Sequence, residues 1–302
     1  MKIAVTGRQG QVVQSLLERA EARPDMEVVA LGRPELDLLK PDTIRSAIAA
    51  VQPDIVVSAA AYTAVDQAED EPETAFAVNS AGAGHVAAAA ADLGVPVIHL
   101  STDYVFDGKK AEPYTEDDRP APQGVYGASK LAGEEAVTAA NPHHLILRTA
   151  WVYSPFGKNF VKTILGLAAE RDELTIVADQ WGNPTSALDI ADGILHVATR
   201  LREDSDFDAW GINHLAGTGE TNWAGFARHI LATNSHYGGA SATVKDIATS
   251  DFPTKANRPA NSRLATGKLA RGFGWTAPKW ERSTEVVVAR LVSANEKGTE
   301  NA

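Results

Sequence analysis

Three side chains in the middle of the chain have the types and spacing needed to reduce a carbonyl group. Tyr126 and Lys130 are four residues apart, so they share one face of a helix, and Thr102 ends an apolar run before them. An ammonium beside a phenol favours the phenolate, lowers the Tyr pKa from its ordinary value of about 10 and makes Tyr126 a usable acid. The spacing predicts that Tyr126 protonates a substrate carbonyl while a nicotinamide delivers hydride. Lys130 would bond the nicotinamide ribose, and Thr102 would bond the substrate oxygen.

A glycine-rich turn near the start of the chain predicts where the dinucleotide binds. Gly7 and Gly10 follow a short apolar strand and precede Gln11 and Val12, which open a helix. Glycines in such a turn let the backbone approach a pyrophosphate at the amino terminus of the helix. Val13 stands where a third glycine would complete the pattern, so we expect the helix to shift from the sheet or to find room elsewhere.

The ends of the second and third strands predict contacts with the rest of the cofactor. An acidic side chain at the tip of the second strand would bond a ribose 2′-hydroxyl, but Arg33 stands there and suits a 2′-phosphate, which favours NADP over NAD. Asp37 and Leu38 follow in a stretch that would border the adenine. After the third strand, small residues around Ala61, Tyr62 and Thr63 let the cofactor lie against the backbone. The expected cofactor contacts are thus Gly7, Gly10, Arg33, Asp37, Leu38, Ala61, Tyr62, Thr63, Tyr126 and Lys130.

Alternating segments in the first half of the chain predict an α/β fold. Continuous apolar strands alternating with helices are typical of a parallel sheet that is covered on both faces. We therefore expect a Rossmann-like, doubly wound parallel sheet with a smaller carboxyl-terminal α+β substrate domain. The predicted strands are 2–6, 27–31, 54–59, 95–101 and 145–148, and the predicted helices are 11–22, 42–51, 73–93 and 126–140.

The alternation weakens after Trp151, and this predicts a domain boundary. Residues 1–150 would form the NADP-binding domain, and 151–302 would form most of the substrate domain. Segments near 171–180 and 213–234 are expected to return to the first domain. Pro, Gly, Ser and Thr become frequent between Ser235 and Pro278, which predicts a loop-rich region there.

Composition excludes several other classes of protein. A net charge of −11 without a run of Lys or Arg argues against a nucleic-acid surface. No apolar run approaches the roughly 20 residues that a membrane helix needs. The chain has no Cys and no signal-peptide pattern, so we expect a cytoplasmic protein. The eight His form no His-x-x-x-His or His-x-Glu cluster, so we expect core or surface histidines and no catalytic metal.

In these motifs the chain resembles the extended short-chain dehydrogenase/reductase superfamily and, within it, most closely the dTDP-4-dehydrorhamnose reductase family. The resemblance covers residues 3 to about 265, and its two most family-specific segments lie in the expected substrate domain. The resembling segments are Gly7-x-x-Gly10, 59–69, 101–108, 125–134, 148–153, Asp179-Gln180-Trp181-Gly182-Asn183-Pro184-Thr185 and Arg258-Pro259-x-Asn261-Ser262-Arg263-Leu264.

The resemblance implies an activity and roles for individual residues. The activity is reduction of the 4-keto group of dTDP-4-dehydro-L-rhamnose, a nucleotide sugar, by NADPH or NADH. It implies that Tyr126 is the proton donor and Lys130 its partner, that Thr102 and Asp103 hold the sugar, and that Trp151 packs against the sugar or its nucleotide. It also implies that Gly10, Gln11 and Val12 line the pyrophosphate of the cofactor.

One position, Ser15, bears on metal binding and assembly. Some family members carry an acidic residue where this chain has Ser15, and there it is linked to magnesium-bridged dimers; Mg²⁺ and a homodimer are therefore open expectations.

Two alternatives to the reductase also stay open. A related nucleotide-sugar dehydratase is disfavoured by Tyr104, since a dehydratase would carry Thr-Asp-Glu at this strand end. A related epimerase is disfavoured because it would carry an acidic residue to bind the ribose, and that residue is missing here. A non-catalytic NADP-binding regulatory subunit would be expected to lack Tyr126 or Lys130.

Overall fold

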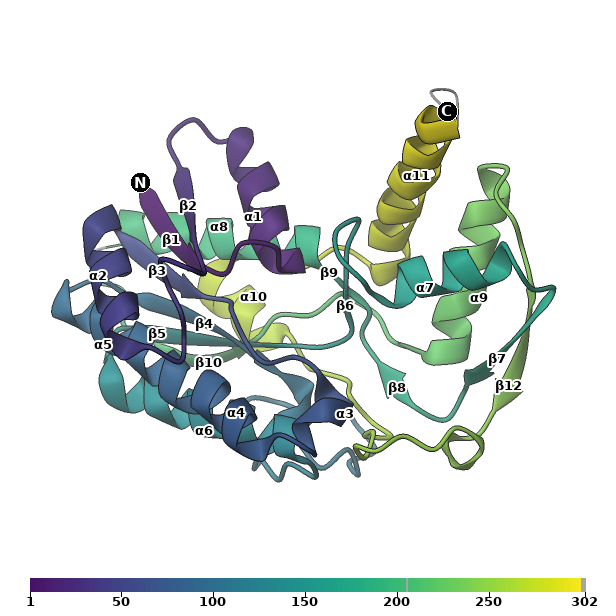
Figure 1. Ribbon diagram of the computed structural model, residues 1–302, viewed down its shortest axis with the longest axis horizontal. Coiled ribbons are helices and arrows are strands. Elements are labelled where there is room, and N and C mark those ends of the chain that lie inside the picture. Colours follow the sequence, from purple (N-terminus) through teal and green to yellow (C-terminus); the bar gives the residue numbers. More distant parts are fainter. Residues whose placement is uncertain (205, 300–302) are drawn as a thin grey trace.

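A six-stranded parallel sheet forms the larger part of the molecule and occupies the left half of Figure 1. The computed structural model describes residues 1–204 and 206–299, with side chains through Ala294. Each strand runs parallel to its neighbours in the order β10-β5-β4-β3-β1-β2, so the chain reverses its direction of travel across the sheet between β1 and β3. The strands are β1 (Lys2–Thr6), β2 (Glu27–Leu31), β3 (Ile55–Ser58), β4 (Val97–Thr102), β5 (His144–Thr149) and β10 (Gly211–His214).

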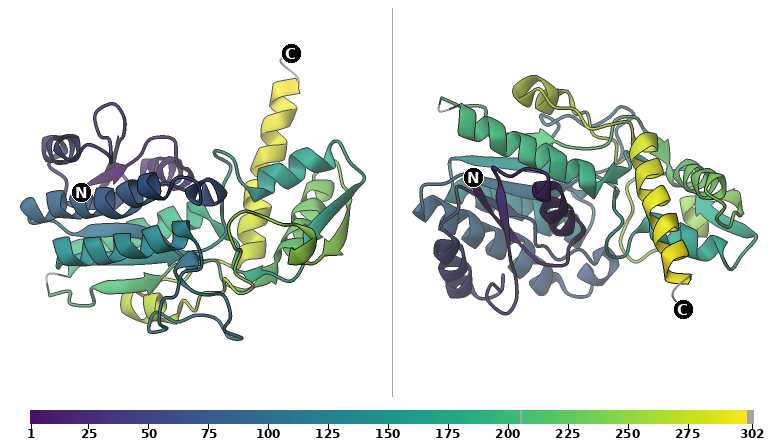
Figure 2. Two further views of the ribbon diagram at one scale, coloured as in Figure 1. Left: turned by 60° about the horizontal axis from the view of Figure 1, so that its bottom comes forward. Right: turned by 90° about the horizontal axis from the view of Figure 1, so that it is seen from above.

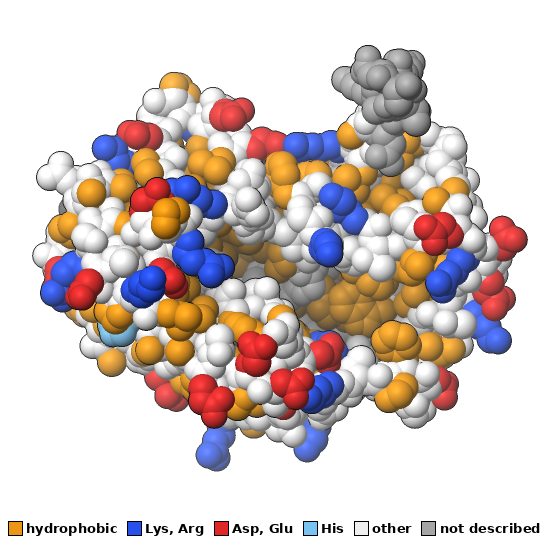
Figure 3. Space-filling view, viewed as in Figure 1, with side chains coloured by type: hydrophobic (Ala, Val, Ile, Leu, Met, Phe, Trp, Pro, Cys, Tyr) orange, Lys and Arg blue, Asp and Glu red, His pale blue; other side chains and the backbone are white. Residues whose placement is uncertain are grey.

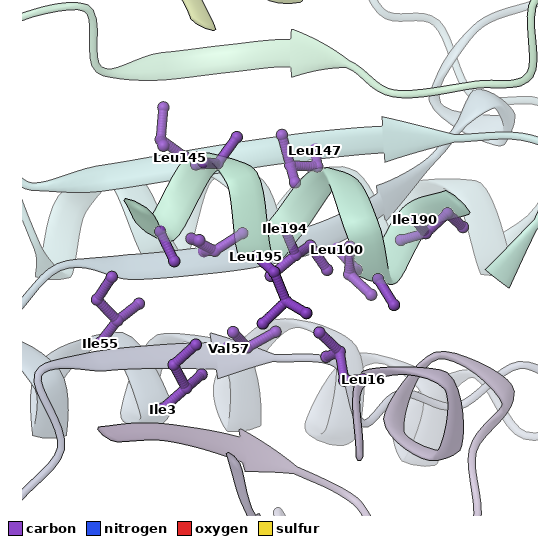
Figure 4. Packing of buried hydrophobic residues seen from close by; sticks show 14 of the residues in the cluster. Ile3, Leu16, Ile55, Val57, Leu100, Leu145, Leu147, Ile190, Ile194 and Leu195 are labelled. Atoms are coloured by element: carbon purple, nitrogen blue, oxygen red, sulfur yellow. The ribbon is translucent and has the colours of Figure 1, made fainter. Parts of the chain in front are cut away.

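Helices cover both faces of this sheet, as continuous apolar strands require. On one face, α1 (Gln11–Glu21), α8 (Ala187–Glu203) and α10 (Gly267–Phe273) bury a cluster whose centre is drawn in Figure 4. The opposite face is covered by α2 (Pro41–Val51), α5 (Ala83–Asp92) and α6 (Val125–Ala140). The left view of Figure 2 shows α5 and α6 side by side. The predicted Rossmann-like fold is confirmed.

The strand β4 carries side chains of two kinds on its two faces. Ile98 and Leu100 enter the core beneath α1 and α8. His99 and Ser101 point the other way and contact polar groups of α6. Because strand side chains alternate between faces, the same strand that anchors the core also aims a polar row at the helix that carries Tyr126.

The smaller part of the molecule lies to the right in Figure 1 and contains three two-stranded sheets packed with helices. Side chains from α7, α9 and α11 meet there in one buried cluster. The strand pairs are β6 (Val152–Tyr153) with β9 (Thr185–Ser186), β7 (Glu173–Val177) with β12 (Thr243–Ile247), and β8 (Trp181–Gly182) with β11 (Thr221–Asn222); the helices are α7 (Phe160–Ala168), α9 (Trp223–His236) and α11 (Trp280–Thr299).

The later segments differ in part from the predicted domain organisation. Strand β10 pairs with β5 at the edge of the large sheet. The segment near 171–180 does not return to that sheet, because β7 pairs with β12 in the smaller part. Within 213–234, α9 packs in the smaller part as well. The strand β12 falls in a region predicted to be loop-rich, since its exposed polar side chains hide the strand pattern.

The predicted helix 73–93 is not a uniform α-helix. It comprises α4 (Pro72–Phe76), the π-helical segment η1 (Ala77–Gly82) and α5. The wider turn carries Asn79, whose side chain bonds both the backbone amide and the carbonyl of Tyr62. Such π-segments are frequent at functional sites, and this one supports a loop of the cavity described below. A short helix, α3 (Val65–Ala68), precedes it.

Among the residues that the structure describes, no helix is both long and apolar enough to cross a membrane.

Candidate active site

A cavity of about 690 Å³ opens at the carboxyl ends of β1, β3 and β4, beside the point where the strand order reverses. Ligands collect at this edge in open α/β sheets. Its wall brings together the three residues predicted to do chemistry, Thr102, Tyr126 and Lys130, with Gly7 and Gly10 of the glycine-rich turn. Segments more than a hundred residues apart in the chain therefore face one space.

The placement of Tyr126 depends on the glycine that follows it. A Cβ on Gly127 would lie 2.1 Å from the carbonyl oxygen of Tyr104, so only glycine lets α6 begin this close to the end of β4. The rings of Tyr104 and Tyr126 then meet edge to face, with centroids 5.5 Å apart. Both rings line the cavity.

The pKa of the Tyr126 phenol is raised, whereas the sequence analysis expected it to be lowered. Burial raises the pKa of Tyr126 well above its ordinary value, and the Thr102 hydroxyl opposes this only in part. Lys130 was expected to lower that pKa, but its ammonium is engaged elsewhere. Lys130 Nζ donates to the carbonyl of Leu100 at 2.6 Å and contacts His99 Nε2 at 3.3 Å. Tyr126 is consequently neutral and carries the proton that a donor needs.

The ammonium of Lys130 is buried between β4 and α6. Burial lowers the pKa of Lys130 to about 8, against the opposing effect of the Glu134 carboxylate one turn further along α6. Glu134 itself is held by Arg148 on β5 through two hydrogen bonds of 2.9 and 2.6 Å, and it accepts a bond of 2.5 Å from Ser101. This ion pair is buried, so its geometry is fixed by packing on all sides.

The glycine-rich turn fits the pyrophosphate of a dinucleotide. Gly7 has φ +102°, a conformation that side chains disfavour, and Gly10 caps α1 without any side-chain hydrogen bond. The first backbone N–H groups of α1 are thus free to bind an anion at the positive end of the helix dipole. Val13 is accommodated because Gly7 lacks a Cβ: that atom would lie 3.3 Å from Val13 Cγ2. Val13 packs in the core, where it is 2% exposed.

The loop after β3 is tied to the turn by hydrogen bonds. Thr6 Oγ1 accepts from the amides of Ala59 and Ala60, both at 3.0 Å. Of the predicted cofactor residues on this loop, Ala61 and Thr63 line the cavity. Tyr62 does not line it; its hydroxyl donates to Glu71 Oε2 at 3.0 Å.

The residues expected around the adenosine lie outside the wall of this cavity. Arg33 is exposed just after β2, and Leu38 packs against the backbone of Gly82.

Sequence reasoning missed Arg8, which sits between two cavity-lining residues. Its side chain lies over Gly32, where a Cβ would come 2.9 Å from Arg8 Cγ, and it pairs with Glu35 at 2.6 Å. Gln11 and Val12 line the cavity, and Asp37 accepts a hydrogen bond from the amide of Leu39.

Asp103 follows Thr102 and carries an unpaired buried oxygen. Its Oδ1 accepts from the Thr102 hydroxyl at 3.0 Å, while no described residue bonds its Oδ2. Burial raises the pKa of Asp103 to about 6, against the opposing effect of the nearby Ser262 and Thr102 hydroxyls. A buried polar atom without a partner in the cavity wall is suited to a ligand hydroxyl.

Trp151 joins this cavity to a second one of about 570 Å³ in the smaller part of the molecule. Its backbone has φ +49°, and its indole stacks on Trp223 with ring centroids 3.6 Å apart. Trp223, Phe160 and Arg258 line the second cavity. Arg258 also donates a hydrogen bond of 3.0 Å to the hydroxyl of Tyr104. Figure 3 shows the hollow between the two parts, with hydrophobic side chains gathered in its wall. Trp223 was missed because its partner is seventy-two positions away in the sequence.

The described residues contain no group of three or more His, Asp or Glu side chains placed to hold a metal ion. Ser15, the position linked to magnesium in the resemblance, is buried and donates to the carbonyl of Gln11 at 2.8 Å. Magnesium is therefore not supported.

Comparison with known proteins places the chain in a family. The family described as "RmlD substrate binding domain" matches residues 1–293. A dTDP-4-dehydrorhamnose reductase from Sinorhizobium fredii is 54% identical over 292 residues, which cover 97% of this chain and 98% of that protein. The chain belongs to the dTDP-4-dehydrorhamnose reductase family. The family resemblance predicted from the sequence is thereby confirmed.

Solved structures agree with this assignment. A dTDP-4-dehydrorhamnose reductase from Clostridium acetobutylicum has a TM-score of 0.89 at 35% identity, covering 96% of this chain and 99% of that one. The enzyme from Bacillus anthracis, solved in complex with NADP, has a TM-score of 0.86 at 34% identity with the same coverage. The family is one of NAD(P)H-dependent oxidoreductases, and the cavity described above has the glycine turn and helix terminus that such a cofactor needs.

Proposed function

We propose that this chain reduces the 4-keto group of dTDP-4-dehydro-L-rhamnose to give dTDP-L-rhamnose, with NADPH as the reductant. One observation carries the proposal: Thr102, Tyr126 and Lys130 line the same cavity as the glycine-rich turn, and Trp151 connects that cavity to a second one. A cofactor space and a substrate space thus meet at the proton donor.

Each residue of the site has a defined task in this reaction. The bound nicotinamide supplies hydride to the carbonyl carbon. Burial keeps the Tyr126 phenol protonated, so it can donate its proton to the carbonyl oxygen as negative charge develops there. The Lys130 ammonium adds positive charge to the same cavity wall. The Thr102 hydroxyl lies in that wall as well and would turn from Asp103 Oδ1 to donate to the substrate oxygen. The unpaired Asp103 Oδ2 would accept a sugar hydroxyl.

The second cavity is the proposed place of the nucleotide. Its aromatic wall of Trp151, Trp223 and Phe160 suits a pyrimidine ring, and Arg258 offers a cation to the diphosphate. The sugar would then lie near Trp151, between this cavity and Tyr126.

Two cations favour NADPH over NADH. Arg8 and Arg33 flank the end of β2, where the second ribose would lie, and the strand tip carries no acidic side chain. Arg8 is held by Glu35, which a 2′-phosphate would displace. A homodimer, a cytoplasmic location and the division into domains near residue 150 remain predictions.

The assay is NADPH oxidation on addition of dTDP-4-dehydro-L-rhamnose, generated by the two enzymes that act before this step. We expect stoichiometric oxidation, and much slower oxidation with the UDP-sugar analogue. An epimerase or dehydratase would release product without net NADPH consumption, and a regulatory subunit would bind NADPH without turnover. Either outcome would refute the reductase assignment.

A further inference from the structure

His99 is a buried titratable group that touches the catalytic lysine and has no role in the reaction described so far. It lies on β4, is 1% exposed and spans two polar partners. Its Nδ1 is 3.0 Å from Ser58 Oγ on β3, and its Nε2 is 3.3 Å from Lys130 Nζ on α6. The sequence analysis expected core or surface histidines, and the burial of His99 agrees with a core position, but its two side-chain contacts connect it to the candidate active site.

The partners of the ring fix its tautomer. A protonated lysine can only donate hydrogen bonds, so His99 Nε2 must accept and the ring proton must reside on Nδ1, which donates to Ser58. Burial and the adjacent Lys130 charge hold the pKa of His99 well below its ordinary value. The ring is therefore a neutral acceptor throughout the range in which Lys130 is charged.

This contact determines where the Lys130 ammonium directs its last donor. Of its three N–H groups, one bonds the carbonyl of Leu100 at 2.6 Å and one meets His99. The described residues supply no third acceptor, and Lys130 lines the cavity. Two fixed acceptors on β4 thus hold the nitrogen and leave one N–H for a ligand in that cavity.

We propose that His99 is a positioning residue for the reduction: its neutral Nε2 anchors the Lys130 ammonium against β4 and keeps it charged and aimed into the cofactor cavity. The proposal rests on the proposed function, because it assigns Lys130 to cofactor binding and proton transfer.

Other groups around Lys130 act on its charge as well. Glu134 lies one turn along α6 and favours the ammonium, while burial disfavours it, which gives a lowered pKa of about 8. Tyr126 is neutral and contributes no charge. In that balance, the hydrogen bond that the ammonium donates to the neutral imidazole favours the charged lysine, so its loss should lower the pKa of Lys130 further.

Two substitutions separate the ends of the imidazole. In His99→Asn the amide takes the place of Nδ1, so it keeps the Ser58 contact but cannot reach Lys130. In His99→Gln the amide reaches the place of Nε2 and keeps an acceptor for Lys130. A matched control is His144→Asn: His144 is also buried, lies on the neighbouring strand β5 and bonds the Asn141 carbonyl, with no contact to Lys130.

The readout is the pH dependence of NADPH binding without sugar, followed by protein fluorescence, together with the alkaline limb of kcat/KM. For His99→Asn we expect both to shift to lower pH by about one unit, since a bond to a charged group is lost. His99→Gln and His144→Asn should keep the wild-type limb. Equal limbs in wild type and His99→Asn would overturn the proposal.

Nitrogen NMR of the wild-type protein tests the tautomer without any variant that could fail to fold. We expect His99 Nε2 to remain an unprotonated acceptor and Nδ1 to carry the proton from about pH 6 to pH 8. A proton on Nε2 would overturn the proposal. If the sugar were not reduced, the binding and NMR measurements would still decide the role of His99, so failure of the two proposals can be told apart.

Discussion

Adding one methyl group at Gly182 should disturb sugar binding and leave cofactor binding intact. A Cβ at this position would lie 2.4 Å from Trp151 Cε2 and 2.7 Å from its Nε1. Carbon atoms in contact need about 3.5 Å, so the indole would have to move by roughly 1 Å. Trp223 stacks on that indole with centroids 3.6 Å apart, and the Trp151 backbone is already in the left-handed region. The displacement therefore breaks or slides the stack.

The size of the effect follows from overpacking. Forcing a methyl group into a packed site costs about 1–3 kcal/mol. If about 1.4 kcal/mol of this is lost from sugar binding, KM for the nucleotide sugar rises about tenfold. Gly182 is not part of the wall of the cavity that the glycine-rich turn lines, so the Kd of NADPH should change little.

The assay compares Gly182→Ala with Gly166→Ala. Gly166 is in α7, where an added Cβ meets nothing within 4 Å, so this control should gain about 0.5–1 kcal/mol of stability and keep wild-type KM. NADPH oxidation gives KM, fluorescence quenching gives the Kd of NADPH, and near-ultraviolet circular dichroism reports the Trp stack. A Gly182→Ala protein with an altered aromatic spectrum but wild-type KM would refute the assignment of Trp151 to the sugar, and an unchanged spectrum would refute the displacement of the stack.

Three further predictions follow from the same site. Tyr126→Phe should lower kcat by about 10²–10⁴-fold and preserve NADPH binding, which kinetics and fluorescence check; wild-type turnover would remove Tyr126 as proton donor. Burial raises the pKa of Asp103 to about 6, so between about pH 4 and pH 6 the folded protein keeps a proton that the unfolded chain has released. The free energy of unfolding should therefore fall by up to about 3 kcal/mol as the pH rises from about 4 to about 6. Urea unfolding should show this loss in wild type and less of it in Asp103→Asn; parallel curves would contradict it. Arg148→Met should lower the free energy of unfolding by about 3–5 kcal/mol, because it leaves the buried Glu134 carboxylate without its partner. Adding Glu134→Met to the same chain should recover much of that loss in urea unfolding. A double variant no more stable than Arg148→Met would show that the loss does not come from the unpaired charge.

Local patterns made the chemical residues predictable. Tyr126 and Lys130 are related by helical periodicity alone, and Thr102 ends an apolar strand that a parallel sheet must bury, so each could be placed without a long-range contact. The role of Gly7 and Gly10 could be predicted for the same reason, since both lie in a single turn between a strand and a helix.

Contacts between distant elements could not be read in this way. The partner of Lys130 is His99, which lies on another element and carries no local signal beyond its burial. The room for Val13 comes from the missing Cβ of Gly7, a packing detail of the folded state. Strand β12 pairs with β7 about seventy residues earlier, and its polar side chains resemble those of a loop.

The most direct test of the reductase chemistry follows an isotope. With NADPH that carries deuterium at the transferred position of its nicotinamide, dTDP-4-dehydro-L-rhamnose should yield dTDP-L-rhamnose with one deuterium bonded to C4 of the sugar, seen by mass and proton NMR. Label lost to solvent, label at another carbon, or a product free of deuterium would contradict direct hydride delivery beside Tyr126.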